Sequence, residues 1–148
     1  MSKLFQALLS GIFFTFILDF FLFLGIKENY IAKYNIDVYY NILFADHQNL
    51  FLFILLSLIL GFVIIYLPNK ISLPVMVSLF ILTFATFIPS IGEWSGQKIL
   101  MQKNKTIQTD RFSYHGDILY NGRHKITLYD HKLKKVIILQ KNKIQKVK

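Results

Sequence analysis

The chain has 148 residues, of which 54% are hydrophobic and 16% aromatic, with a formal net charge of +9 and a mean hydropathy of +0.46. This composition is too apolar for an ordinary small water-soluble domain, so the sequence favours an integral membrane protein. Cysteine is absent, which excludes disulfides, thiolate metal sites and cysteine nucleophiles.

Three apolar runs are long enough to cross a hydrocarbon core of about 30 Å, which takes roughly 20 residues of helix. We expect these spans at about 4–26, 50–67 and 73–92, within a transmembrane domain over 1–97. The first run is longer than the apolar core of a secretory signal peptide, and no small-residue cleavage motif follows it. The sequence therefore predicts that this span is retained.

The segment after the first span is too polar to cross a membrane. Over about 29–46, Lys33 and Asp37 fall on one helical stripe, while Val38 and Ile42 fall on the other side. We predict an amphipathic helix in the plane of the interface, with a plain linking loop as the alternative. The expected interfacial anchors are Tyr30, Tyr34, Tyr39, Tyr40 and, after the third span, Trp94.

Prolines punctuate the rest of the apolar domain. Pro68 and Pro74 are expected to bracket the turn between the second and third spans. Pro89 is expected to kink the end of the third span. Residues 93–105 are then expected to continue as a short polar helix.

From about residue 106 the pattern changes to short β-branched and aromatic runs separated by turn-forming residues. Asn121-Gly122 predicts a β-hairpin with a type I′ turn, and further turns are expected at 130–132 and 141–143. Four or five strands predict a small twisted sheet or a small barrel. The fold class is thus an α-helical membrane domain of three transmembrane helices and an interfacial helix, followed by a β domain over 98–148.

Charge divides these two domains. Residues 98–148 carry thirteen basic and three acidic residues, a net charge of +10, whereas residues 1–97 carry −1. The positive-inside rule favours a cytoplasmic β domain and an external N-terminus. The excess of lysine over arginine fits an AT-rich coding sequence and a bacterial source, so the expected location is a bacterial inner membrane. Anionic lipids are the expected partners of the basic domain. The basic face for lipids or protein partners is predicted from Lys132, Lys134, Lys135, Lys141, Lys143 and Lys146.

Asp19 is the one ionisable residue within the first apolar run. A carboxylate in hydrocarbon costs at least a few kcal/mol, so something must compensate it. The alternatives are a protonated acid bonded to a hydroxyl side chain, a carboxylate near a watery cleft, and a cation from another chain. The hydroxyl candidates are Ser57, Thr83 and Thr86.

Small residues predict helix contacts. Ser57 and Gly61 lie four residues apart, and Ser10 with Gly11 offers a second patch for close approach. The residues expected to serve helix packing or assembly are therefore Asp19, Ser57, Gly61, Thr83 and Thr86.

Catalytic and ligand-binding motifs are absent from the sequence. His115, His124 and His131 match no zinc spacing, and neither a glycine-rich phosphate loop nor a nucleophile elbow occurs. We predict no enzymatic activity, no metal and no cofactor.

The sequence favours a non-enzymatic scaffold or assembly subunit of a larger membrane complex, expected to be oligomeric. One alternative is a channel or transporter component that uses Asp19. The other is a membrane-tethered nucleic-acid-binding protein. Its base-stacking residues would be Phe112, Tyr114, Tyr120 and Tyr129.

Overall fold

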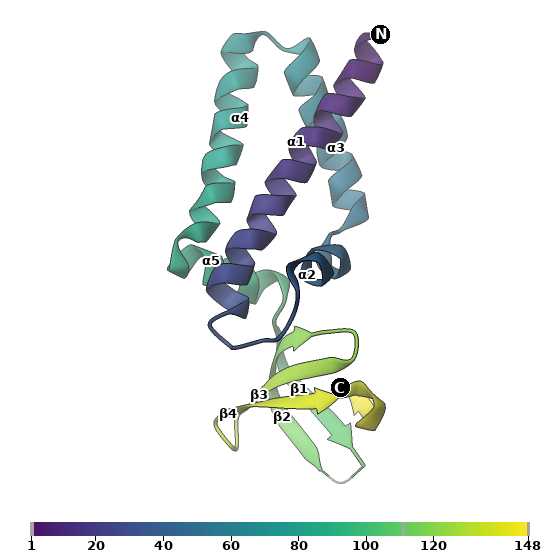
Figure 1. The fold of residues 1–148 in the computed structure, drawn as a ribbon, viewed down its shortest axis with the longest axis vertical. Coiled ribbons are helices and arrows are strands. Elements are labelled where there is room, and N and C mark those ends of the chain that lie inside the picture. The colour runs from purple at the N-terminus through teal and green to yellow at the C-terminus, as the bar shows by residue number, and fades with distance from the viewer. Residues whose placement is uncertain (1, 111, 148) are drawn as a thin grey trace.

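A helical region and a β-sheet lie end to end along the long axis of the molecule (Figure 1). The computed structural model describes residues 2–110 and 112–147 of the chain. The helices are α1 (Lys3–Ile26), the π-helical turn η1 (Lys27–Ile31), α2 (Tyr40–His47), α3 (Leu50–Tyr66), α4 (Asn69–Phe84), the 3-10 turn η2 (Ala85–Phe87) and α5 (Pro89–Ile99). The strands are β1 (Gln102–Thr109), β2 (Ser113–Asn121), β3 (Lys125–Asp130), β4 (Lys135–Gln140) and β5 (Ile144–Val147), with the 3-10 turn η3 (Lys141–Lys143) before β5.

Local capping sets several of the helix ends. Ser2 Oγ accepts a hydrogen bond from the N–H of Phe5 at the start of α1, and Asn49 Oδ1 accepts one from Leu52 at the start of α3. Pro89 is the first residue of α5, a position at which its missing N–H has no helical partner to lose. The apolar run predicted over 73–92 is therefore divided between α4 and α5.

The prediction of a single helix over 29–46 is wrong. Helix α1 continues through η1 to Ile31, Asn35 adopts a left-handed conformation with φ of 50°, and residues 36–39 form no regular secondary structure before α2 begins. A continuous helix would separate the side chains of Ile31 and Ile36 by about 140° around its axis. The break lets both of them enter the same buried cluster.

The predicted turn between Pro68 and Pro74 is also shorter than expected. Pro68 caps α4, which begins at Asn69, and Pro74 lies inside this helix. A proline here removes one backbone hydrogen bond, the one to the carbonyl of Lys70. Because Lys70 is exposed beside the connection, water can replace that bond.

The strands form one antiparallel sheet in the order β4-β3-β2-β1-β5. The sheet is open, with β4 and β5 at its edges, so the sheet alternative holds and the barrel alternative is wrong. Helix α5 ends at Ile99 and strand β1 begins at Gln102, so the polar helix expected over 93–105 ends earlier than predicted. The start of β1 contains a bulge at Asn104, which has a φ of 54°.

The hairpin predicted at Asn121-Gly122 is confirmed, since β2 and β3 pair on either side of it. The type I′ turn is wrong, because neither residue has a positive φ. The N–H of Gly122 donates to the carbonyl of Lys125 at 3.0 Å, so the loop is wider than a two-residue turn. The other two predicted turns are confirmed as the β3–β4 turn and η3.

Two buried clusters hold the molecule together. One lies within the sheet and comprises Ile107, Ile118, Ile126, Leu128 and Leu139. The other lies between the sheet and the end of the helical region nearest to it. It comprises Phe23, Ile26, Tyr30, Ile31, Ile36, Leu43, Leu100, Leu119 and Tyr120. We call the second one the join cluster.

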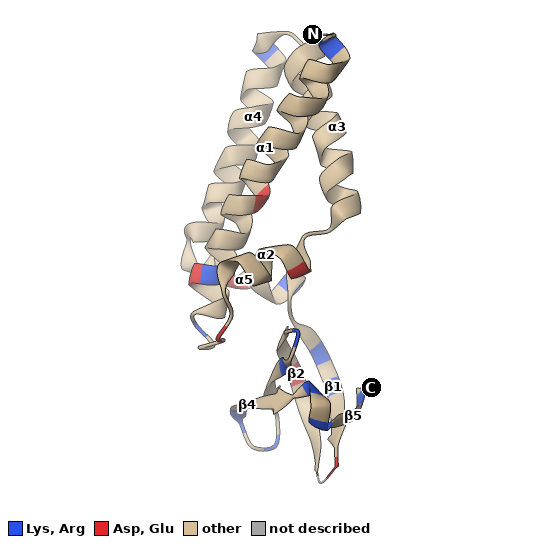
Figure 2. Cartoon of the chain, turned by 45° about the vertical axis from the view of Figure 1, so that its right-hand side comes forward, with Lys and Arg blue, Asp and Glu red and all other residues tan. Residues whose placement is uncertain are grey.

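Among the residues that the structure describes, two helical segments are long and apolar enough to cross a membrane, Lys3–Ile31 and Asn69–Phe87. Helices α2 and α3 make a third candidate if this pair, bent by 84°, is counted as one span. Figure 2 shows that charged residues gather at the ends of the helical region and on the sheet. The one acidic band along α1 is Asp19.

Candidate functional site

Helices α1 and α3 touch backbone to backbone. A Cβ atom added to Gly11 would overlap the carbonyl oxygen of Ser57, and one added to Gly61 would overlap that of Ala7. Ser57 is buried, and its Oγ donates to the carbonyl of Phe53 at 2.8 Å. The structure thus brings Ser57, Gly61 and Gly11 together in one contact within the chain, which we call the α1–α3 seam.

Asp19 lies on α1, next to the residues that lead into α3. Gln48 Nε2 donates to its Oδ2 at 3.1 Å, and Gln48 immediately precedes the Asn49 cap of α3. The positive end of the α3 dipole is therefore close to the carboxylate. The structure gives Asp19 a different partner from the three hydroxyl residues predicted from sequence.

Thr86 is the centre of a second close contact, between the end of α1 and the start of α5. Its Oγ1 donates to the carbonyl of Thr83 at 2.7 Å, and its own carbonyl accepts from Asn29 Nδ2 at 2.9 Å. A Cβ atom on Gly25 or Gly92 would overlap atoms of Thr86. Thr86 therefore bonds to Thr83 and to Asn29 of η1, and within the described residues neither threonine bonds to Asp19.

Gly96 makes room for the ring of Tyr30 in the same region. Sequence reasoning missed this contact, although Gly92 and Gly96 have the four-residue spacing that permits close helix approach. Asn29 and Tyr30 carried no such signal, because their partners are far away in the chain.

The sheet is attached to the helices by a buried hydrogen bond. The hydroxyl of Tyr30 donates to the carbonyl of Leu119 in β2 at 2.8 Å, and neither residue is more than 2% exposed. At the periphery, Arg123 pairs with Asp46 of α2 through Nε and Nη2, at 2.6 to 2.9 Å. Together with the join cluster, these contacts fix the β2–β3 hairpin against the end of α1 and α2.

The predicted interfacial aromatics have unequal positions. Tyr30 is fully buried, and the hydroxyl of Tyr40 donates to the carbonyl of Phe20 at 2.8 Å. Tyr34 is partly buried against the ring of Tyr30. Tyr39 and Trp94 remain 74% and 60% exposed, so these two are the ones free to contact headgroups.

The lysines of the predicted basic face lie at three places. Lys132, Lys134 and Lys135 lie at one end of β4, whereas Lys141 and Lys143 lie in η3 at the other. Six residues of strand separate Lys135 from Lys141, which is about 20 Å. The structure places Lys146 in β5, at the opposite edge of the sheet from β4.

Two aspartates organise the polar parts of the sheet. Partial burial raises the pKa of Asp117, but hydrogen bonds from the N–H of Asn104 and from His131 together lower it by more than burial raises it. The pKa of Asp117 therefore lies below its ordinary value. The N–H groups of Leu133 and Lys132 likewise lower the pKa of Asp130 more than its burial raises it.

A metal centre is not evident: within 2–110 and 112–147, no three His, Asp or Glu side chains are grouped to hold an ion. His131 and His115 stack edge to face, with 5.7 Å between ring centroids. Their partners are Asp117 and Thr106, respectively. These bonds connect neighbouring strands of the sheet.

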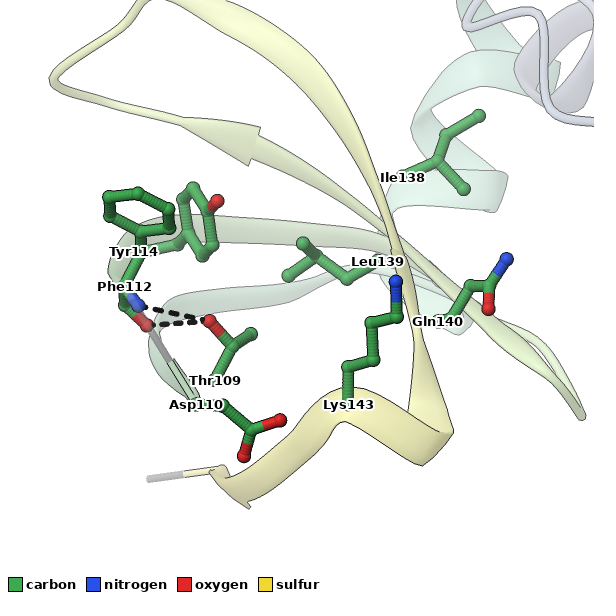
Figure 3. Close-up of a pocket in the computed structure, with 8 residues that line it drawn as sticks. All are labelled: Thr109, Asp110, Phe112, Tyr114, Ile138, Leu139, Gln140 and Lys143. Carbon is green, nitrogen blue, oxygen red and sulfur yellow. Dashed lines mark hydrogen bonds between the residues drawn. The ribbon is translucent and has the colours of Figure 1, made fainter.

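A cavity of about 600 Å³ opens in the sheet beside η3 (Figure 3). Phe112 and Tyr114 line one side of it, Lys143 the other, and Thr109 Oγ1 bonds to the backbone of Phe112. Tyr120 instead belongs to the join cluster, and Tyr129 packs against this cluster. The four aromatics predicted to stack bases therefore do not form one surface.

No family model, curated protein or solved structure matches this chain. The fold and the site define a two-part protein in which an apolar helical bundle is joined through a buried contact to a basic antiparallel sheet.

Proposed function

We propose that the protein is a multi-pass membrane scaffold that holds its basic sheet at the membrane surface, as a structural or assembly subunit of a larger complex and without enzymatic activity. The buried bond from Tyr30 to Leu119 is the observation that carries this proposal. A sheet on a flexible tether would need no such bond. A fixed sheet presents the same surface at the same height above the helices.

The outer surface of the helices supports a lipid environment. Large apolar side chains on all three long helices are more than 40% exposed, a pattern that water disfavours at this extent. Examples come from each helix and include Leu4, Phe13, Phe51, Leu58, Leu73 and Leu82.

Helix lengths give the apolar layer a thickness. Helix α3 has 17 residues and α4 has 16, about 25 Å each at 1.5 Å per residue. Asp19, next to the start of α3, then lies at the edge of that layer and not at its centre. There a carboxylate is within reach of water and costs far less than in hydrocarbon.

Charge supports a cytoplasmic sheet in a bacterial inner membrane. The N-terminus and the α3–α4 connection lie at the end of the bundle away from the sheet (Figure 1), and they carry only Lys3 and Lys70. The sheet-side ends carry Lys27, Lys33 and Lys98. The excess of lysine on that side is the positive-inside pattern.

Partner subunits are expected on the exposed faces of the helices. Because the α1–α3 seam is occupied within the chain, the small residues Ser57 and Gly61 are not available for another copy. The outer face of α4 is the better candidate, with Leu73, Ile81 and Leu82 each more than 60% exposed.

The test is affinity purification of the tagged full-length chain from membranes in a mild detergent, after alkaline carbonate washing. We expect the chain to stay in the washed membrane and to be recovered with other membrane proteins or as an oligomer. Tyr30→Phe should weaken this recovery by loosening the sheet, whereas Tyr66→Phe, at an exposed tyrosine at the end of α3, should not. A chain that is monodisperse in buffer without detergent, or that always purifies alone, contradicts the proposal.

A further inference from the structure

An amphipathic cleft lies between the segment that leads into α2 and the β2–β3 hairpin. Its volume is about 310 Å³, and one wall is apolar, formed by Ile36, Val38, Tyr39 and Ile42. The opposite wall comes from the sheet and includes Arg123, His124 and Lys125.

A second hollow of about 310 Å³ continues from the basic wall. It shares Arg123, His124 and Lys125 with the first and adds Lys141 and Asn142 from η3. The N–H of Lys141 donates to the carbonyl of His124 at 2.9 Å, which fixes these two cationic segments side by side. The combined cleft is therefore apolar toward α2 and cationic toward η3.

The charge balance of the cleft leaves it cationic. Asp46 accepts from Nε and Nη2 of Arg123, and among the bonds within the described residues none uses Nη1. Asp37 lines the apolar half, so two acids oppose the three permanent cations Arg123, Lys125 and Lys141. An anion at the basic end thus meets an excess of positive charge and an open edge of a guanidinium group.

One buried polar atom in the wall has no partner. Tyr120 lines the cleft and is 4% exposed, and its hydroxyl makes no hydrogen bond with the residues that the structure describes. A buried hydroxyl is normally satisfied, so a small shift of the Tyr120 ring toward the cleft, where a phosphate or glycerol oxygen of an occupant would accept its proton, would supply the missing hydrogen bond.

We infer that this cleft binds one anionic phospholipid from the leaflet next to the sheet, with the phosphate at Arg123, Lys125 and Lys141 and the first part of the acyl chains along Val38, Tyr39 and Ile42. The inference rests on the proposed membrane location, which puts α2 and this cleft at headgroup height. The volume suits a headgroup with the start of its chains, being at the lower end of ligand pockets. The bound lipid would contact both the segment that leads into α2 and the β2–β3 hairpin, and would thereby strengthen the attachment of the sheet.

The experiment uses the purified full-length protein in a mild zwitterionic detergent, with lipid binding measured by native mass spectrometry. Phosphatidylglycerol should bind at least about tenfold more tightly than phosphatidylcholine, since about 1 kcal/mol is gained per nearby lysine. Lys125→Gln with Lys141→Gln should remove that preference and leaves the pair of Arg123 with Asp46 in place. Lys132→Gln with Lys134→Gln removes the same charge outside the cleft and should keep the preference within about twofold.

Equal losses in both double variants would overturn the site in favour of diffuse attraction. Displacement of the lipid by glycerol phosphate alone would show a plain phosphate site, and displacement by a short single-stranded oligonucleotide would show a nucleic-acid site. Either result contradicts the inference. Failure of the proposed membrane location is seen separately, because the wild-type chain would then leave carbonate-washed membranes before any lipid is added.

Discussion

The helical region and the sheet are held together internally by different means. In the helices the tightest contacts are between backbones, at glycine and other small residues, while large apolar side chains point outward. The sheet instead has a buried apolar cluster that includes Ile107, Ile118 and Leu128, and most of its lysines are exposed beside a few apolar side chains. The proposed membrane location accounts for this difference, because helices surrounded by lipid do not gain from hiding their apolar side chains, whereas a sheet in water does.

The comparison predicts that the largest loss of stability follows from adding bulk to the α1–α3 seam. Gly11→Leu should separate the two helices and cost about 3 kcal/mol or more, because the clash is with backbone that cannot move aside. Ile12→Leu, at a neighbouring residue that is 40% exposed, is the matched control. Thermal unfolding in detergent followed by circular dichroism measures both, and similar melting temperatures would disprove the importance of the seam.

A smaller loss is expected at the boundary between the two regions. Tyr30→Phe removes the donor to Leu119 and leaves a buried carbonyl unsatisfied, at a cost of about 1–2 kcal/mol. Hydrogen exchange of the β2 amides should accelerate while exchange in α1 stays the same. Unchanged protection of β2 would mean that the hydrophobic contacts of the join cluster are sufficient alone.

The sheet should respond to acid through Asp117. Because its pKa in the folded chain is lowered from the ordinary value of 3.8, its stabilisation is present above about pH 4 and is lost as the pH falls through the lowered value. Asp117→Asn should remove this acid dependence at a cost of less than about 1 kcal/mol near neutral pH. Asp110→Asn, in the β1–β2 connection, serves as the control. Melting curves recorded between about pH 7 and about pH 3, a range that includes the titration of ordinary carboxyl groups, compare the variants. An unaltered acid profile in Asp117→Asn would contradict the assignment.

The smallest effect is expected at the exposed pair of Arg123 and Asp46. Arg123→Gln should lower the melting temperature slightly, and only at low ionic strength, because salt screens exposed ion pairs. Arg123→Lys should restore part of the effect by keeping the charge without the two-point geometry. A loss that persists at high salt would show that Arg123 packs against the sheet as well as pairing with Asp46.

Local patterns predicted the helices and strands well, and the contacts between distant segments poorly. The run at 4–26 coincides with α1, and Asn121-Gly122 lies at the β2–β3 hairpin, because both signals depend on neighbouring residues. The positions of Asp19 and Tyr30 depend instead on Gln48 and Leu119, which are 29 and 89 residues away. No periodicity encodes such partners. By contrast, the four-residue spacing of Gly92 and Gly96 is a local signal, and it would have predicted that α5 packs closely against Thr86 and Tyr30.

The wide turn at the end of α1 has a consequence for chain length. In η1 the N–H of Ala32 bonds to the carbonyl of Lys27, five residues back, so this turn contains one residue more than an α-helical turn. The wide turn thus accommodates one extra residue without rotating the segments on either side of it, whereas deleting a residue within the regular part of α1 would rotate the two ends of this helix against each other by about 100°. The rotational alignment of the helical region and the sheet therefore depends on the number of residues in α1: most substitutions leave it intact, whereas one codon lost between Gly11 and Lys27 would turn either the glycine away from α3 or the hydroxyl of Tyr30 away from its carbonyl.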